Sequence, residues 1–170
     1  MRMASGKQEK TSEKGLSILL GSIVNSFPGA AGADYSEITL YDRRNNEFIT
    51  AAATLGERNE AFAGKKSGYA MDDRKKALAQ NVMESKNPLI IHDVGDALLS
   101  DADTDMINRL GIKSIAVFPM FAGDRFVGSI SFDYDGHTHR FTQQEINGMY
   151  GFADLAAHMI DYAQRRSPAG

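Results

Sequence analysis

The fold is decided by residues 111–145, GIKSIAVFPMFAGDRFVGSISFDYDGHTHRFTQQE. The first part, 112–120, is apolar and β-branched, and 126–134 alternates with a period of two, as a strand on a half-covered sheet does. A Gly-Asp turn signal separates the two parts, so they predict a β-hairpin. Thr142 precedes Glu145 by three residues, which is the spacing of a capping box, so we expect a helix to begin there.

The composition is that of one globular domain. The chain has 170 residues, of which 42% are hydrophobic and 24% charged, and this length is enough to bury a real core. A net charge of −3 argues against nucleic acid or an anionic membrane as the main partner. The sequence shows neither a run of about 20 apolar residues nor a secretory signal, so we expect a soluble, cytoplasmic protein.

Hydrophobic periodicity predicts the elements that flank the hairpin. A polar segment, 1–14, is expected to be flexible or to begin a helix, and the amphipathic helix that follows is expected to end at Pro28-Gly29. The further expected elements are strands over 35–42 and 47–55, a loop with a short strand near Tyr69, a helix over 74–86, a strand over 89–94, a short helix over 106–110 and a last helix over 142–163 before a polar tail, 164–170. This order predicts one α+β domain, 15–163, with a largely antiparallel sheet.

Several residues in this order match a known pattern. They are Gly111-Ile112-x-Ser114, Pro119-Met120, Gly128-x-Ile130-x-Phe132, Phe141-Thr142-x-x-Glu145, Gly32-Ala33-Asp34 and Pro88-Leu89-Ile90-Ile91-His92-Asp93-Val94. Their series resembles a GAF domain, the small-molecule sensing module of bacterial and eukaryotic signalling proteins. The resemblance covers about residues 15–163. It implies a central antiparallel sheet with the terminal helices on one face and the loops and helices of a ligand pocket on the other.

Residues and motifs that the sequence lacks exclude some of the ligands and activities known in this family. Members of the family bind cyclic nucleotides, bilins, haem, amino acids or small anions, and some only dimerise. The chain has no cysteine, which excludes a cysteine-linked bilin, the family's cysteine-dependent reduction of free methionine sulfoxide, disulfides and any cysteine-based zinc site. The Asn-Lys-x-Phe…Asp-Glu series of cyclic-nucleotide binders is absent. A non-enzymatic sensor of another ligand, or a dimerisation module without a ligand, remains.

Each of three expected strands has one apolar and one semi-polar face. The apolar faces are Ile38 and Leu40; Ile49, Ala51, Ala53 and Leu55; and Ile130, Phe132 and Tyr134, and they suit the terminal helices. The semi-polar faces are Glu37, Thr39 and Tyr41; Phe48, Thr50, Ala52 and Thr54; and Ser129, Ser131 and Asp133. Simple exposure to solvent would also explain them. The resemblance favours a pocket, because this face of the sheet is covered in GAF domains.

We therefore expect a small polar ligand on the semi-polar face. Buried carboxylates need partners, so the ligand would be cationic or rich in hydrogen-bond donors. The expected contacts are Glu37, Thr39, Tyr41, Thr50, Phe62, Asp105, Ser131 and Asp133, with Phe62 and Asp105 closing the pocket. The segment Gly64-Lys65-Lys66-Ser67-Gly68 could instead cover an anionic ligand, and a zwitterion would reconcile the two preferences.

The other groups of candidate metal-binding, catalytic or haem-binding residues are weaker candidates for a site. Asp101, Asp103 and Asp105 resemble the start of an EF-hand loop, but Met106 and Ile112 replace the required glycine and glutamate, so acids at a helix N-terminus are favoured. His137 and His139 lack a third metal ligand. His92-Asp93 lacks a nucleophile, and haem on His92 is kept only as a second alternative.

The terminal helices have a second expected role. Apolar stripes that contain Leu16, Ile23, Met149 and Ile160 would favour a homodimer through a helical bundle, unless the sheet consumes both stripes. A downstream signalling protein would be the further partner, and the chain would be a stand-alone sensor or part of a longer protein.

Overall fold

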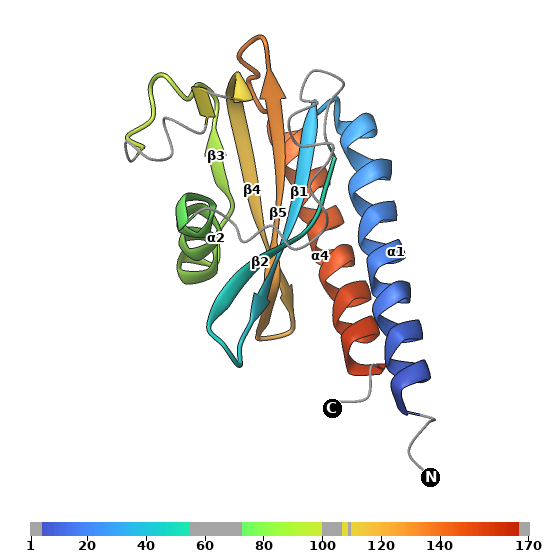
Figure 1. Cartoon of the computed structure of the whole chain (residues 1–170). Coiled ribbons are helices and arrows are strands. Elements are labelled where there is room, and N and C mark those ends of the chain that lie inside the picture. Colours follow the sequence, from blue (N-terminus) through green and yellow to red (C-terminus); the bar gives the residue numbers. More distant parts are fainter. Residues whose placement is uncertain (1–4, 55–72, 100–106, 109, 167–170) are drawn as a thin grey trace.

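Five antiparallel strands form one sheet in the order β2-β1-β5-β4-β3. The computed structural model describes residues 5–54, 73–99, 107–108 and 110–166 (Figure 1). Within them the strands are β1 Tyr35–Asp42, β2 Glu47–Thr54, β3 Leu89–Ile91, β4 Ile112–Ala122 and β5 Arg125–Asp135, and the helices are α1 Ser5–Ala31, α2 Asp73–Ser85 and α4 Gln143–Arg166. The predicted α+β class and the antiparallel sheet are confirmed.

Both terminal helices are longer than the sequence predicts. Helix α1 begins at Ser5, within the segment expected to be flexible or to begin a helix, and continues past Pro28 to Ala31. Proline has a helical φ and removes only one amide donor, so it need not end a helix. The helix ends at Gly32, whose φ of 68° is the left-handed conformation of a C-terminal cap. Helix α4 includes the first residues of the expected polar tail, and Arg165 Nε supports its last turn by donating to Asp161 Oδ2 over 2.8 Å.

The other boundaries lie close to those expected. Strands β4 and β5 extend a little beyond the expected hairpin, whereas β3 ends at Ile91 rather than Val94. The amide of Val94 still donates to the carbonyl of Lys113 over 2.9 Å, after a two-residue break in the strand pairing. Residues 107, 108 and 110 are helical, as expected. The short strand near Tyr69 lies outside the described residues.

Two layers cover the two faces of the sheet (Figure 1). Helices α1 and α4 lie side by side and antiparallel on one face, and they enclose the main core. Side chains with no exposed surface at its centre include Ile38, Phe118, Ile130, Phe132 and Ile160. Helix α2 covers the other face, where Val82 packs with Ile115 and Val117 of β4. None of the described helices combines the length and hydropathy that crossing a bilayer requires.

Strand β2 contains a β-bulge that changes its faces. Ile38 pairs with Ala52, but Thr39 pairs with Thr50, so Ala51 is an extra residue. Beyond this point the predicted alternation is wrong. Ala52 and Thr54 lie opposite residues of β1 that face α1 and α4, and Ala53 lies opposite Glu37, which faces α2.

The stripe residues expected to form a dimer lie mostly within the domain. Ile23, Met149 and Ile160 are buried in the main core, and Leu16 packs against it. These side chains therefore pack within the domain and are not available for a contact with a second copy. The apolar side chains that are exposed on the terminal helices are others: Ile18, Tyr150, Leu155, Met159 and Tyr162. The expected face was misassigned because both helices carry apolar residues on more than one side.

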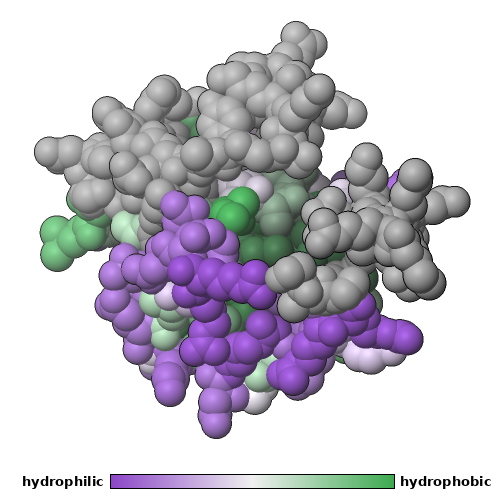
Figure 2. Space-filling view, turned by 60° about the horizontal axis from the view of Figure 1, so that its bottom comes forward, coloured by the Kyte–Doolittle hydropathy of each residue, from purple (hydrophilic) through white to green (hydrophobic). Residues whose placement is uncertain are grey.

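The end of the molecule that carries the hairpin turns is mainly hydrophilic (Figure 2). The exposed β1–β2 turn contributes residues 43–47. Hydrophobic atoms are visible in the recess at the centre of this view and at its left edge (Figure 2). An aromatic cluster lies next to the turns, with the Phe48 ring 5.0 Å from that of Tyr41 and 6.4 Å from that of Phe126.

Candidate ligand pocket

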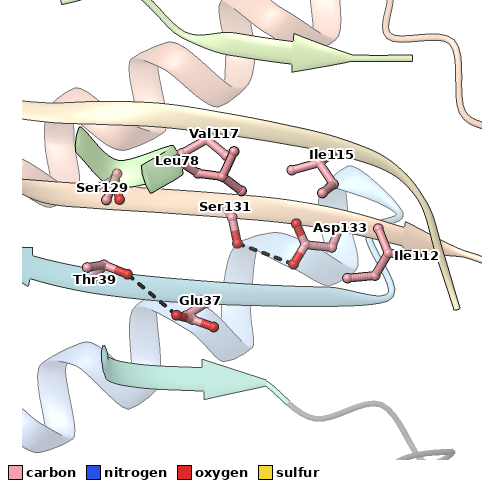
Figure 3. A pocket seen from close by; sticks show the side chains of 10 residues that line it. Glu37, Thr39, Leu78, Ile112, Ile115, Val117, Ser129, Ser131 and Asp133 are labelled. Carbon is pink, nitrogen blue, oxygen red and sulfur yellow. Dashed lines mark hydrogen bonds between the residues drawn. The ribbon is translucent and has the colours of Figure 1, made fainter. Parts of the chain in front are cut away.

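A pocket lies between the sheet and α2 (Figure 3). Strands β1 and β5 provide a polar floor, and β4 and α2 provide an apolar wall. Its lining comprises Glu37, Thr39, Leu78, Ala79, Ile112, Ile115, Val117, Ser129, Ser131 and Asp133. The cavity volume is about 30 Å³, which is room for one or two water-sized groups.

Strand register brings the polar side chains together. Glu37 of β1 pairs with Ser131 of β5, and Thr39 pairs with Ser129, without a register shift between these strands. Because side chains alternate along a strand, residues two apart on β1 and on β5 share the face toward α2. Strand β4 continues the same rows with apolar residues, since Val117 lies opposite Ser131 and Ile115 opposite Asp133.

Hydroxyl groups surround the two carboxylates. Glu37 is 8% exposed, and its Oε1 accepts hydrogen bonds from Thr50 Oγ1 over 3.0 Å and from Thr39 Oγ1 over 3.5 Å. Asp133 is equally buried, and its Oδ2 accepts from Ser131 Oγ over 3.3 Å (Figure 3). Hydroxyl groups of β1, β2 and β5 thus donate hydrogen bonds to the two carboxylates.

Ser129 is the polar lining residue that the prediction omitted. Its side chain lines the pocket and only 4% of the residue is exposed. The strand alternation already placed Ser129 on the correct face, and that signal could have identified it.

The predicted site residues divide into three groups. Glu37, Thr39, Ser131 and Asp133 line the pocket together, and Thr50 adjoins it through its hydrogen bond to Glu37. Tyr41 does not line it: its ring packs in the aromatic cluster at the hairpin turns, and its hydroxyl donates to Asn46 Oδ1 over 2.7 Å. Phe62 and Asp105 lie outside the described residues.

The prediction also omitted Leu78 and Ala79, the residues that α2 contributes to the apolar wall. The sequence predicted a helix over 74–86, but not which part of the sheet this helix covers. Its place depends on contacts with strands far away in the chain, such as Ala79 with Phe48 and Phe126. A sequence pattern within one helix does not contain these contacts.

The strand that carries Asp133 also contacts both terminal helices. The amide of Asp34, just after α1, donates to the carbonyl of Asp133 over 3.0 Å. The next residue, Tyr134, points to the opposite face, and its hydroxyl donates to the carbonyl of Ala31 over 2.8 Å. Burial raises the pKa of Tyr134 to about 12. Its ring stacks on His139, with centroids 4.1 Å apart, just before α4.

The predicted capping box begins α4. The amide of Thr142 donates to Glu145 Oε2 over 2.7 Å, and the amide of Glu145 donates to Thr142 Oγ1 over 3.2 Å. The bond from the Thr142 amide lowers the pKa of the Glu145 carboxyl, with smaller contributions from the Thr142 hydroxyl and from His139. The Thr142–Glu145 pair therefore fixes where the helix starts.

The histidines lie away from the pocket. His92 does not line it, and His92 Nδ1 accepts a hydrogen bond from the amide of Phe141 over 3.2 Å. His139 Nε2 lies 3.0 Å from Glu145 Oε1. No group of three or more potential metal ligands gathers in the part of the chain that the structure describes. The acidic series 101–105 lies outside that part.

Similarity to known proteins agrees with this architecture. The family model for the GAF domain matches residues 19–160. The PixJ GAF domain of Thermosynechococcus elongatus, in its blue-light absorbing form, is 13% identical with a TM-score of 0.71, over 91% of this chain and 90% of that one. The GAF domain of an Acinetobacter phosphoenolpyruvate-protein phosphotransferase is 14% identical with a TM-score of 0.66, over 97% and 98%.

A GAF domain/HD domain protein of Geobacter sulfurreducens is 15% identical with a TM-score of 0.67, over 88% of this chain and 94% of that one. No curated protein matches the chain. At these identities the solved structures establish the fold, while the family match spans most of the chain. The chain therefore belongs to the GAF domain family.

Proposed function

We propose that this domain is a non-enzymatic sensor that binds a small polar molecule between the sheet and α2. GAF domains commonly serve in sensing and signalling. The observation that carries the proposal is the pocket itself, in which two carboxylates and three hydroxyl side chains face an apolar wall. A few well-placed polar groups in a mostly apolar hollow are typical of a site for a small molecule.

The size of the pocket limits the ligand. A volume of about 30 Å³ admits one or two water-sized groups. A larger ligand would require α2 to move away from the sheet.

The surroundings of Asp133 support a route from ligand to helices. Asp133 lines the pocket, its carbonyl accepts from the amide of Asp34 between α1 and β1, and Tyr134 contacts Ala31 and His139. A ligand that shifts Asp133 would therefore act within one residue of contacts to both terminal helices. The proposed recipient of the signal is a downstream protein in the cytoplasm.

The alternative is a dimerisation module without a ligand. Leu155, Met159 and Tyr162 are exposed along one side of α4 at helical spacing, and Ile18 is exposed on α1. This apolar side favours association with a second copy of the chain. Sedimentation of the wild type and of Leu155→Glu would test it, because a charge at the centre of a dimer contact should yield the monomer.

Ligand binding is tested in two steps. Native mass spectrometry of the purified protein reports a retained small molecule, and thermal shift against small amines, carboxylates, amides and amino acids reports affinity. Glu37→Gln changes the charge but hardly the shape, and it should reduce the thermal shift by a ligand, whereas Glu47→Gln, at an exposed position of β2, should not. A panel without any shift, or an equal response of Glu37→Gln and wild type, would refute the proposal.

A further inference from the structure

We propose that Arg125 links the helix that covers the pocket to the last turns of α4, so that a movement of α2 changes how firmly the end of α4 is held. The inference rests on the proposed function, because it names a route by which an occupied pocket would act on α4. This route uses the β4–β5 turn, at the opposite end of β5 from Asp133 and Tyr134. Its evidence is the two faces of the turn residues, the bonds from Arg125 to α4 and a buried nitrogen of the same side chain.

Adjacent residues of β5 contact the two layers that cover the sheet. Phe126 packs with Ala79 of α2 in the aromatic cluster. Arg125, one residue earlier, binds α4 on the other face. The pairing of β5 with β4 skips Val127, and without this extra residue the strand alternation would turn Phe126 toward α4 instead. A displacement of α2 that moves Phe126 therefore acts directly on the residue that binds α4.

Arg125 holds two positions in the last two turns of α4. Its Nη2 donates to Asp161 Oδ1 and, over 3.2 Å, to Gln164 Oε1. Asp161 Oδ2 also accepts from Arg165 Nε over 2.8 Å. Although burial alone would raise the pKa of the Asp161 carboxyl, the hydrogen bonds from Arg165 and Arg125 lower it. One carboxylate therefore joins the β4–β5 turn to α4, whose C-terminal end lies at the same end of the molecule as this turn (Figure 1).

The Nε atom of Arg125 gives this contact a second arrangement. It is buried and has no hydrogen-bond partner within the described residues, while Nη2 alone serves both acceptors on α4. A buried donor without a partner is unfavourable, and arginine binds a carboxylate most strongly through two parallel N–H groups. A small displacement of the turn that brings Nε to Asp161 would create such a pair. The turn and α4 therefore have two discrete ways to meet, which is what coupling between distant sites requires.

The end of α4 also carries exposed apolar side chains. Met159 and Tyr162 lie on either side of Asp161 in the sequence, and both are exposed. Arg166 Nη1 donates to the Tyr162 hydroxyl over 2.7 Å, so this ring belongs to the same last turns. A change in how Arg125 holds Asp161 would alter the position of these side chains. The pocket would thereby act on the apolar side of α4 that would bind a second copy of the chain.

Hydrogen exchange of the ligand-free full chain tests the link. Ala79→Val adds two methyl groups at a buried position against Phe126, so it should displace α2, and the amides of 161–166 should exchange about 2- to 30-fold faster. Arg125→Lys keeps the charge but removes the planar fork, so adding Ala79→Val to this variant should leave those amides unchanged. Ala77→Val makes the same substitution on the exposed side of α2 and should have no effect at 161–166.

A second pair of variants guards against a folding defect. Phe126→Leu loosens the same contact without adding atoms, and it should speed exchange at 161–166 when Arg125 is present but not in Arg125→Lys. Arg44→Lys, in the exposed β1–β2 turn, is the control for the arginine change and should leave the effect of Ala79→Val intact.

Two outcomes would overturn the inference. One is that Ala79→Val and Phe126→Leu act equally on 161–166 with and without Arg125, and the other is that neither acts on them at all. The exchange measurements contain no ligand, so either outcome would leave the proposed function standing. Conversely, a ligand panel without any thermal shift would refute the proposed function and leave the link between α2 and α4 standing.

Discussion

Gly128→Ala should destabilise the protein because β1 and β5 are too close at this position for a side chain. A Cβ atom on Gly128 would lie 2.0 Å from the carbonyl oxygen of Thr39 and 3.0 Å from the Cα of Leu40. Real Cβ contacts are essentially never shorter than 3.0 Å, so the strands would have to separate by about 3.0 − 2.0 = 1.0 Å. The obstacle is backbone, which cannot swing aside as a flexible side chain does.

The expected loss in the free energy of unfolding is about 2 to 4 kcal/mol, which combines an overpacking cost of about 1 to 3 kcal/mol with about 1 kcal/mol for a weakened hydrogen bond between Gly128 and its partner strand. Thr39 belongs to the floor of the pocket, so the same displacement should also weaken ligand binding.

Urea unfolding followed by circular dichroism measures this loss. Gly148→Ala is the matched control, because it adds the same atom at an α4 position where, apart from the neighbouring residues and the backbone of the helix itself, nothing lies within 4 Å of that atom. Alanine replaces glycine there within a helix, so this variant should be more stable by about 0.5 to 1 kcal/mol. The reasoning would be refuted if Gly128→Ala stayed within about 1 kcal/mol of the wild type, a loss smaller than the lightest overpacking expected for a backbone contact.

Two further predictions concern pH. Burial raises the pKa of Tyr134 from 10.0 to about 12, so the unfolded chain loses this proton first, and its contribution is intact below pH 10. The free energy of unfolding should fall by about 2 to 3 kcal/mol as the pH rises toward 12, and urea titrations of Tyr134→Phe should lack this part of the slope. The pKa of Glu145 is instead lowered from 4.5, chiefly by the Thr142 amide, so its contribution is present above that value and is lost as the pH falls through the lower folded pKa. Glu145→Gln should therefore melt lower than the wild type at neutral pH but lose less stability in acid, and parallel acid profiles would contradict this.

Local signals predicted most of the fold. The hairpin, the capping box and the alternation of β1 and β5 each depend on residues close together in the chain, and the structure confirms them. The predicted end of α1, at Pro28-Gly29, was wrong because it relied on such a local signal. Proline is a strong stop signal in general, but here the backbone turns only at Gly32, whose positive φ is a property of the chain path and not of composition.

The pocket could be predicted from local signals only in part. The floor was predictable because β1 and β5 pair without a shift over the residues that form it, so period-two alternation holds on both strands at once. Strand β2 breaks the same rule at Ala51, since a bulge inserts a residue that no polarity pattern marks. Ser129 represents a third case. Its face was predictable, but its place in the lining depends on β4 and α2, which pack beside that part of β5 and lie far from it in the chain or on another strand. The polar lining residue that the prediction omitted was therefore visible in the sequence and recognisable only in the structure.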